Sequence, residues 1–177
     1  GCVFADRVNT VSPSYANEIR TPAFGEGLQD VLACRGSDLG GIINGLDTDS
    51  FDPRTDPALP FLFDGDATKF KAKNKAALMD ELGLRCPPDT PLVAMVTRMT
   101  AQKGFDLVME SIDRIMQRNV ALVLLGTGDK RYEDFMRSAE YRYHGRLCSY
   151  LSYSEALSRR IYAGADLFLM PSAFEPC

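Results

Sequence analysis

Two cations in the segment that follows the apolar run Leu92 to Val96 are the residues best suited to chemistry. Arg98 and Lys103 stand in the sequence Thr-Arg-Met-Thr-Ala-Gln-Lys-Gly, and a helical pattern begins directly after it. Arginine offers a rigid fork of donors, lysine a mobile point charge, and a helix N-terminus free amides that attract anions. The segment therefore suits a diphosphate better than a single carboxylate. Two solvated surface cations would give the same sequence, because Arg and Lys are common in exposed turns.

A turn that contains glycine follows the second apolar run, Val120 to Leu125. Gly126 and Gly128 precede another helical pattern, and glycines let a backbone approach a ligand closely. Arg131 stands where the dinucleotide-binding pattern G-x-G-x-x-G has its third glycine, and no G-K-[ST] follows. Dinucleotide binding of the dehydrogenase type and P-loop phosphate chemistry are therefore both disfavoured.

Two later segments each place one functional side chain after an apolar run. Tyr153 could stack on a nucleobase, although packing in the core explains a tyrosine there equally well. Glu175 could accept hydrogen bonds from sugar hydroxyls, and capping of a following helix is its alternative role. Cations, glycine turns, an aromatic ring and a carboxylate along one sheet edge together favour a sugar nucleotide as the ligand.

These residues need a sheet that gathers them, and the alternation of apolar runs with helical patterns predicts one. The pattern is typical of an α/β fold with a Rossmann-like, doubly wound parallel sheet. In such sheets the ligand binds beyond the carboxyl ends of the strands, where the segments described above would lie. The expected strands are 92–96, 120–125, 146–151 and 166–170, and the expected helices are 105–118, 130–143 and 154–164.

The first part of the chain predicts short elements followed by a long connection. Ser12-Pro13 has the form of an N-cap with a first-turn proline. The expected elements are a strand at 8–11, a helix to about residue 20, a helix at 28–34 and a strand at 40–44. Residues 46–65 are dense in Asp and Pro, which favours an irregular connection, and 45–65 is the expected interdomain linker.

A lysine-rich helix is expected after this connection, from the N-cap Asp66 to about residue 82. The stripe predicted to be buried consists of Ala76, Leu78, Met79 and Leu82.

Composition excludes several classes of function. The 177 residues carry a net charge of -4, so no global basic field would attract nucleic acid or an anionic membrane. The longest apolar stretch, Val120 to Leu125, is far shorter than the ~20 residues that span a bilayer, which predicts a soluble intracellular protein. Five cysteines without a C-x-x-C pair and a single histidine, His144, indicate neither a disulfide framework nor a metal site.

Four segments, taken in order, resemble bacterial glycogen synthases and plant starch synthases. They are 5–16 (ADRVNTVSPSYA), 41–47 (GIINGLD), 98–104 (RMTAQKG) and 174–177 (FEPC). The resemblance implies a GT-B glycosyltransferase that moves glucose from ADP-glucose to the non-reducing end of an α-1,4-glucan, with retention and without metal or cofactor.

The resemblance also implies an internal fragment of such an enzyme. Residues 1–44 would end the N-terminal Rossmann-like domain, 45–65 would be the linker, and 66–177 would form most of the nucleotide-sugar domain. The family's Lys-Thr-Gly-Gly-Leu loop and its active-site histidine are not found, so this chain alone is expected to be inactive.

Residue roles follow from the matching motifs. Arg98 and Lys103 would neutralise the departing diphosphate, and Glu175 would hold the glucosyl hydroxyls. The residues expected to bind substrate are Asn44, Gly126, Gly128, Tyr153 and Cys177. His144 matches no catalytic position of the family.

Two alternatives remain at this point: a retaining GT-B transferase that uses a UDP- or GDP-sugar, and a nucleotide-binding module without catalysis. The expected partners are ADP-glucose and α-1,4-glucan, with neither nucleic acid nor membrane, and no oligomeric state is predicted. The expected location is a bacterial cytoplasm or a plastid stroma.

Overall fold

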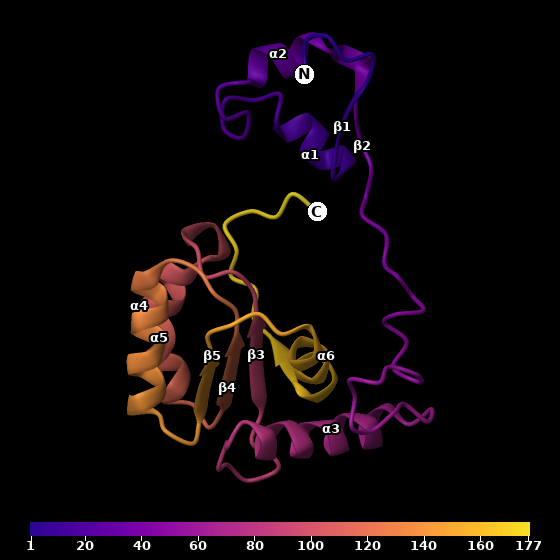
Figure 1. Cartoon of the computed structure of the whole chain (residues 1–177). Helices are drawn as coiled ribbons and strands as arrows, with labels where there is room; N and C mark the ends of the chain where they lie inside the picture. The colour runs from indigo at the N-terminus through magenta and orange to yellow at the C-terminus, as the bar shows by residue number, and fades with distance from the viewer. The chain divides into compact units, whose positions relative to one another are not determined.

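The computed structural model describes residues 1–177 (Figure 1). The chain folds into two compact units. Unit 1 consists of Gly1–Asp47 with Phe174–Cys177, and unit 2 consists of Thr48–Ala173. These bounds differ from the predicted ones, because residues 48–65 belong to unit 2 and the last four residues belong to unit 1.

Unit 1 contains a small parallel pair of strands and short helices. Its elements are β1 (Val8–Thr10), α1 (Pro13–Glu18), α2 (Gln29–Cys34), η1 (Gly36–Asp38) and β2 (Leu39–Gly41). The Ser12 hydroxyl accepts a hydrogen bond from Tyr15 N at 2.9 Å, so the predicted cap of α1 is confirmed. The same hydroxyl donates to Pro176 O at 2.7 Å, and Phe24 meets Phe174 edge-on at 5.7 Å. These contacts explain why the end of the chain groups with unit 1.

Unit 2 is built on a four-stranded parallel sheet with the strand order β5-β4-β3-β6. The strands are β3 (Leu92–Val96), β4 (Ala121–Leu125), β5 (Leu147–Tyr150) and β6 (Leu167–Phe168). The helices are α3 (Ala67–Glu81), η2 (Ala101–Lys103), α4 (Phe105–Met116), α5 (Lys130–Arg142) and α6 (Glu155–Gly164). The predicted α/β doubly wound sheet is confirmed.

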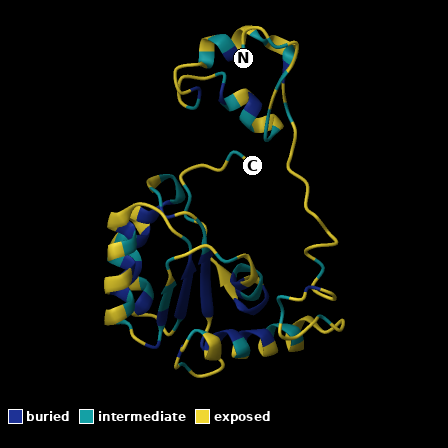
Figure 2. Ribbon diagram, viewed as in Figure 1, coloured by how far each residue is buried: buried dark blue, intermediate teal, exposed yellow.

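Helices cover both faces of this sheet, and the inner strands β3 and β4 are buried between them, whereas β6 at one edge is exposed (Figure 2). Along β4, Leu122 and Leu124 pack with α4 and α5 in one core. The alternate residues Ala121, Val123 and Leu125 pack with α3 and α6 in the other. Because successive strand residues point to opposite faces, an uninterrupted apolar run supplies both cores.

The buried face of α3 differs from its prediction. Leu78 and Met79 are buried as expected, but Ala76 is exposed and Leu82 is only half-buried. Two polar residues, Asn74 and Lys75, are buried instead. An apolar stripe cannot reveal them, because what permits their burial is a set of distant hydrogen-bond partners.

Each of those polar residues has a partner far along the chain. Asn74 Nδ2 donates to Phe61 O at 3.0 Å, and Lys75 Nζ lies 2.6 Å from Asp166 Oδ2. Burial alone would raise the pKa of Asp166, but the hydrogen bonds from Lys75 and from Leu92 N outweigh it, and the pKa is lowered. Asp166 is therefore held as a carboxylate that joins α3 to the start of β3.

The N-cap of α3 offers a test of local stability. Asp66 accepts from Lys69 N at 3.0 Å, as the sequence predicts. Replacing Asp66 by Ala leaves that amide without its side-chain partner and should lower the free energy of unfolding by about 1 kcal/mol. Urea denaturation measures the change, and Asp66→Asn should recover most of it. Equal stability of the alanine variant and the wild type would contradict the capping role.

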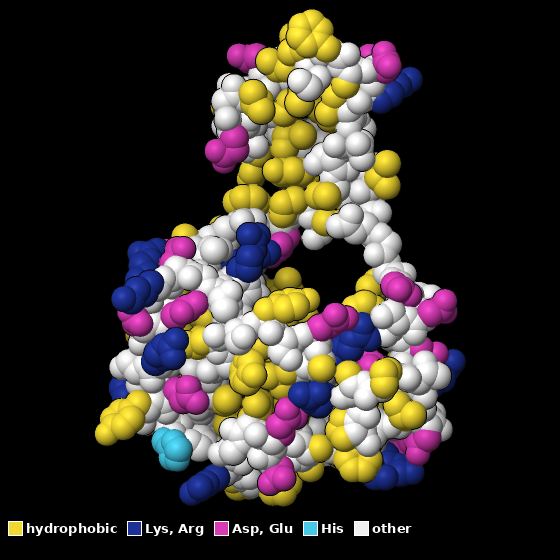
Figure 3. Space-filling model, in the orientation of Figure 1, with side chains coloured by type: hydrophobic (Ala, Val, Ile, Leu, Met, Phe, Trp, Pro, Cys, Tyr) yellow, Lys and Arg dark blue, Asp and Glu magenta, His cyan; other side chains and the backbone are white.

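All five cysteines are free, and burial raises the pKa of the Cys148 thiol to about 11. No helix has the length and apolar character needed to cross a bilayer. On the face of unit 2 drawn in Figure 3, cationic and anionic side chains are interspersed and form no continuous basic surface.

Candidate functional site

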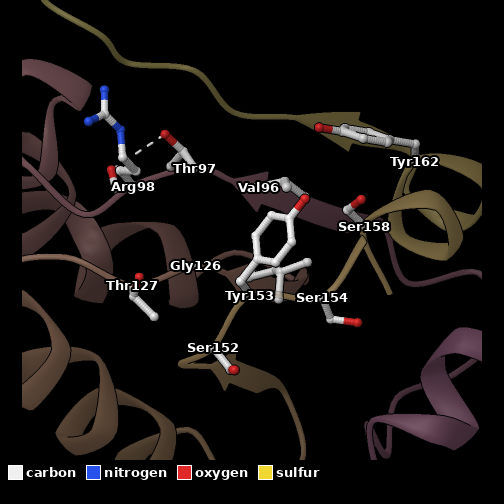
Figure 4. A pocket seen from close by; sticks show the side chains of 11 residues that line it. Val96, Thr97, Arg98, Gly126, Thr127, Ser152, Tyr153, Ser154, Ser158 and Tyr162 are labelled. Carbon is white, nitrogen blue, oxygen red and sulfur yellow. Dashed lines mark hydrogen bonds between the residues drawn. The ribbon is translucent and has the colours of Figure 1, made fainter. Parts of the chain in front are cut away.

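A cavity of about 320 Å³ opens at the carboxyl ends of the strands of unit 2. The loops after β3, β4 and β5 line it together with one side of α6 (Figure 4). Its principal lining residues are Thr97, Arg98, Gly126, Tyr153, Ser158 and Tyr162. The strand order reverses direction at β3, from which the sheet grows first through β4 to β5 and then back to β6. Such a switch point is where open α/β sheets bind ligands.

The structure brings three of the predicted site residues together in this cavity: Arg98, Gly126 and Tyr153. Lys103 and Gly128 belong to the same unit but do not line the cavity. The other three predicted residues lie in unit 1; they are Asn44, Glu175 and Cys177.

Arg98 lies at the edge of the cavity beside Thr97 (Figure 4). Its side chain is exposed, and its guanidinium forms no ion pair within the chain. The local hydrogen bonds of Arg98 are made by its backbone carbonyl, which accepts from Thr100 N at 3.1 Å and from Thr97 Oγ1 at 3.4 Å. The donor fork of Arg98 is therefore available to an anionic ligand.

The glycines of the second loop are also required for packing between two loops. A Cβ on Gly126 would lie 1.9 Å from Thr97 O, and one on Gly128 would lie 2.1 Å from Met99 O. Met99 N also donates to Thr127 O at 2.9 Å. The glycines thus allow the loops after β3 and β4 to contact each other, and this contact helps to hold the Arg98 loop in place.

Gly128 is further restricted by a bond of its own. Its amide donates to Glu133 Oε1 at 3.0 Å, a carboxylate in the first turn of α5. That amide is therefore already satisfied within the protein.

The N-terminal ends of α4 and α5 are fixed to each other and to the loop after β6. Gly104, the N-cap of α4, has a φ of 75°, and a Cβ there would lie 2.1 Å from Pro171 O. Asp106 in the first turn of α4 accepts a hydrogen bond from the hydroxyl of Tyr132 at 3.0 Å. The elements that carry Arg98 and Lys103 are consequently anchored on two sides.

Tyr153 is 84% exposed, so the alternative that it packs in the core is wrong. Its ring stands over the cavity between the end of β3 and the start of α6 (Figure 4). Ser154 caps α6 by accepting from Leu157 N at 3.2 Å, which fixes the residue next to the ring. An exposed ring on an ordered backbone is suited to stacking on a planar ligand.

Sequence reasoning missed two lining residues, Ser158 and Tyr162. They follow Ser154 at spacings of four and eight residues, so all three lie along one side of α6. That spacing is the signal that could have found them. The Tyr162 ring packs on Phe168 of β6 at 5.3 Å, and burial raises the pKa of its phenol above the ordinary value.

Unit 2, a doubly wound parallel sheet with a cavity beyond its strand ends, has the Rossmann-like fold of the GT-B glycosyltransferases. The catalytic domain of starch synthase IV from Arabidopsis thaliana, solved with ADP and acarbose, is 40% identical with a TM-score of 0.90. The match covers 99% of this chain and 36% of that one. Anabaena HepE, solved with UDP and glucose, is 16% identical with a TM-score of 0.60 over 98% of this chain and 39% of its own, which supports the fold alone.

The sequence comparisons identify the family. Residues 1–34 match the family described as starch synthase catalytic domain, and residues 90–177 match glycosyl transferases group 1. Glycogen synthase of Streptococcus equi subsp. equi is 50% identical over 99% of this chain, and that of Bacillus subtilis is 44% identical over 100% of it. The chain belongs to the glycogen and starch synthase family. It spans 37% of the length of these two relatives.

Proposed function

We propose that an active protein that carries this chain transfers glucose from ADP-glucose to the non-reducing end of an α-1,4-glucan, with retention, and that the cavity of unit 2 receives the nucleotide. The observation that carries the proposal is the placement of Arg98 and Tyr153 on one cavity, a cation for phosphate and an exposed ring for a base. Family membership supports the reaction, and the ADP and acarbose in the starch synthase IV structure support the two substrates.

The proposed chemistry needs charge stabilisation more than proton transfer. As the glucosyl bond breaks, negative charge grows on the departing diphosphate, and fixed cations stabilise that charge. Arg98 would supply a bidentate contact and Lys103, on η2, a second cation at the start of α4. Both residues lie on segments that the glycine contacts described above hold in place.

Unit 1 contributes further residues to the proposal. Glu175 would accept hydrogen bonds from the glucosyl hydroxyls, with Asn44 and Cys177 also on the sugar side. The domain assignment of the two units as acceptor-side and donor-side halves belongs to the same proposal. The proposed location of the protein is a bacterial cytoplasm or a plastid stroma.

The donor nucleotide separates the proposal from its nearest alternative. A transferase of the same fold that prefers a UDP- or GDP-sugar would share the diphosphate contacts and differ at the base. A competition series with ADP, UDP and GDP against bound ADP-glucose distinguishes them, and ADP is expected to compete best.

The role of Tyr153 tests the nucleotide site directly. Stacking of a base on an aromatic side chain contributes about 1–3 kcal/mol, so Tyr153→Ala should weaken ADP binding by about tenfold or more, whereas Tyr153→Phe should remain within about twofold. Isothermal titration calorimetry measures the Kd. Tyr141, 87% exposed on α5 and outside the cavity, provides the control variant Tyr141→Ala. The site is misassigned if both alanine variants bind ADP as the wild type does.

A further inference from the structure

The beginning of unit 2 is a folded segment, although its sequence is that of a linker. Residues 48–63, called here the strap segment, contain no helix or strand but bond to themselves and to α3. Phe63 N donates to Pro53 O at 2.9 Å, and Asn74 Nδ2 donates to Phe61 O at 3.0 Å. One end of the strap segment is thereby attached to α3.

A single side chain, Arg159 of α6, attaches the other end. It donates to Asp56 Oδ2 at 3.1 Å, to Ser50 Oγ at 3.0 Å and to Glu155 Oε1 at 2.6 Å, and it also bonds to Ser50 O. Its guanidinium carbon lies 4.3 Å from the centre of the Phe51 ring. Arg159 therefore contacts three residues of the strap segment and one of its own helix.

The pairing of Arg159 with Asp56 is buried, with side-chain exposures of 11% and 6%. Asp56 is fixed through its second oxygen as well, because Oδ1 accepts from Ala58 N at 2.9 Å. A buried pair of this kind has one favourable geometry, since the guanidinium fork has fixed donor directions and loss of either partner strands a charge. These bonds therefore hold the strap segment and α6 in a fixed position relative to each other.

The two sides of α6 have different neighbours. Glu155 and Arg159, four residues apart, face the strap segment. Ser154, Ser158 and Tyr162, also four residues apart, line the cavity (Figure 4). Because Ser158 is next to Arg159 in the helix, any rotation or shift that releases Arg159 also moves the wall of the cavity.

We propose that Arg159 is a positioning residue for the nucleotide cavity: by fastening the strap segment to α6, it sets the place of the wall formed by Ser158 and Tyr162. The ligand's identity in this inference rests on the proposed function. A displacement of about 1 Å at a binding wall is enough to cost a large factor in affinity or rate.

Arg160 provides a matched control within the same helix. It forms a two-pronged ion pair with Glu81 of α3, at 2.9 Å from Nε and 2.8 Å from Nη2. Arg160 thus has the same charge and a similar partner, but it ties α6 to α3 and makes no contact with the strap segment. A difference between the two variants reports the strap contact and not the loss of a helix arginine.

The experiment compares Arg159→Ala, Arg159→Lys and Arg160→Ala in the whole 177-residue chain. Calorimetry gives the Kd for ADP, and amide hydrogen exchange gives the protection of residues 54–59 and 155–158 without any ligand. Arg159→Ala should weaken ADP binding by about tenfold or more and speed exchange in both segments by at least about tenfold. Arg159→Lys should recover only part of the lost ADP affinity and exchange protection. Arg160→Ala should stay within about twofold of the wild type in both the Kd for ADP and the exchange rates.

Arg159→Ala leaves the Asp56 carboxylate buried without its cation, and this could prevent the variant from folding. A double substitution keeps the test decisive in that case. Arg159→Met with Asp56→Asn removes both charges and keeps the volume. Its ADP affinity should still be at least about tenfold weaker, and an affinity within about twofold of the wild type would overturn the proposal. Equal weakening by Arg160→Ala would overturn it too.

The exchange measurement separates this inference from the proposed function. If the wild-type chain bound no ADP, the nucleotide assignment would fail. Faster exchange at residues 155–158 in the Arg159 variant than in the Arg160 variant would still support the positioning of α6. Equal exchange in the two variants would refute it.

Discussion

Replacing Arg98 or Lys103 by alanine should lower the rate of glucosyl transfer by about a hundredfold or more in an active protein that carries this chain. Charge appears on the leaving diphosphate only as the bond breaks, so the two cations should act mainly in the transition state. The KM for ADP-glucose should therefore change less than kcat. Steady-state kinetics of each variant measures both constants.

The chemistry of the cation can be tested at the same position. Arg98→Lys should recover only part of the lost rate, because a point charge cannot reproduce a two-pronged contact. Arg114→Ala is the control, since Arg114 is an exposed cation on α4 outside the cavity. If both alanine variants stay within about threefold of the wild type, a loss below ~1 kcal/mol, the two residues are solvated surface cations.

Substituting Gly126 by alanine should lower the free energy of unfolding more than the Asp66 and Gly83 substitutions do. The added Cβ would lie 1.9 Å from Thr97 O, at a φ of 154°, and the atom it meets belongs to backbone that cannot move alone. Overpacking and backbone strain together should lower the free energy of unfolding by about 2–4 kcal/mol. Chemical denaturation measures this change, and the ADP affinity should fall as the Arg98 loop is displaced.

Gly83→Ala separates the two causes. Gly83 also has a positive φ, 65°, but no atom lies within 4 Å of the Cβ that would be added. It should therefore lose only about 1 kcal/mol, the cost of a left-handed backbone conformation for alanine. Equal losses at both glycines would show that contact between the loops after β3 and β4 does not matter to stability.

The sequence by itself determined the type and order of the elements and the family. Strands such as β4 are uninterrupted apolar runs, and helix starts at Ser12, Asp66 and Ser154 are marked by capping residues that bond three positions onward. Both signals work within a few residues of the chain, so a linear pattern is enough to contain them. The ends of the strands are enough to predict that Arg98 and Tyr153 lie at one edge of the sheet.

Only the tertiary structure decided what surrounds those residues. The contact of Arg159 with Asp56 spans 103 residues, and the carbonyl that requires Gly126 belongs to the loop after a different strand. The hydrophobic periodicity of a sequence cannot predict such contacts, because they depend on which segments the sheet brings side by side. For the same reason the Asp- and Pro-rich composition of residues 48–63 predicts a linker, whereas in the structure this stretch forms a buried ion pair with α6 and belongs to unit 2.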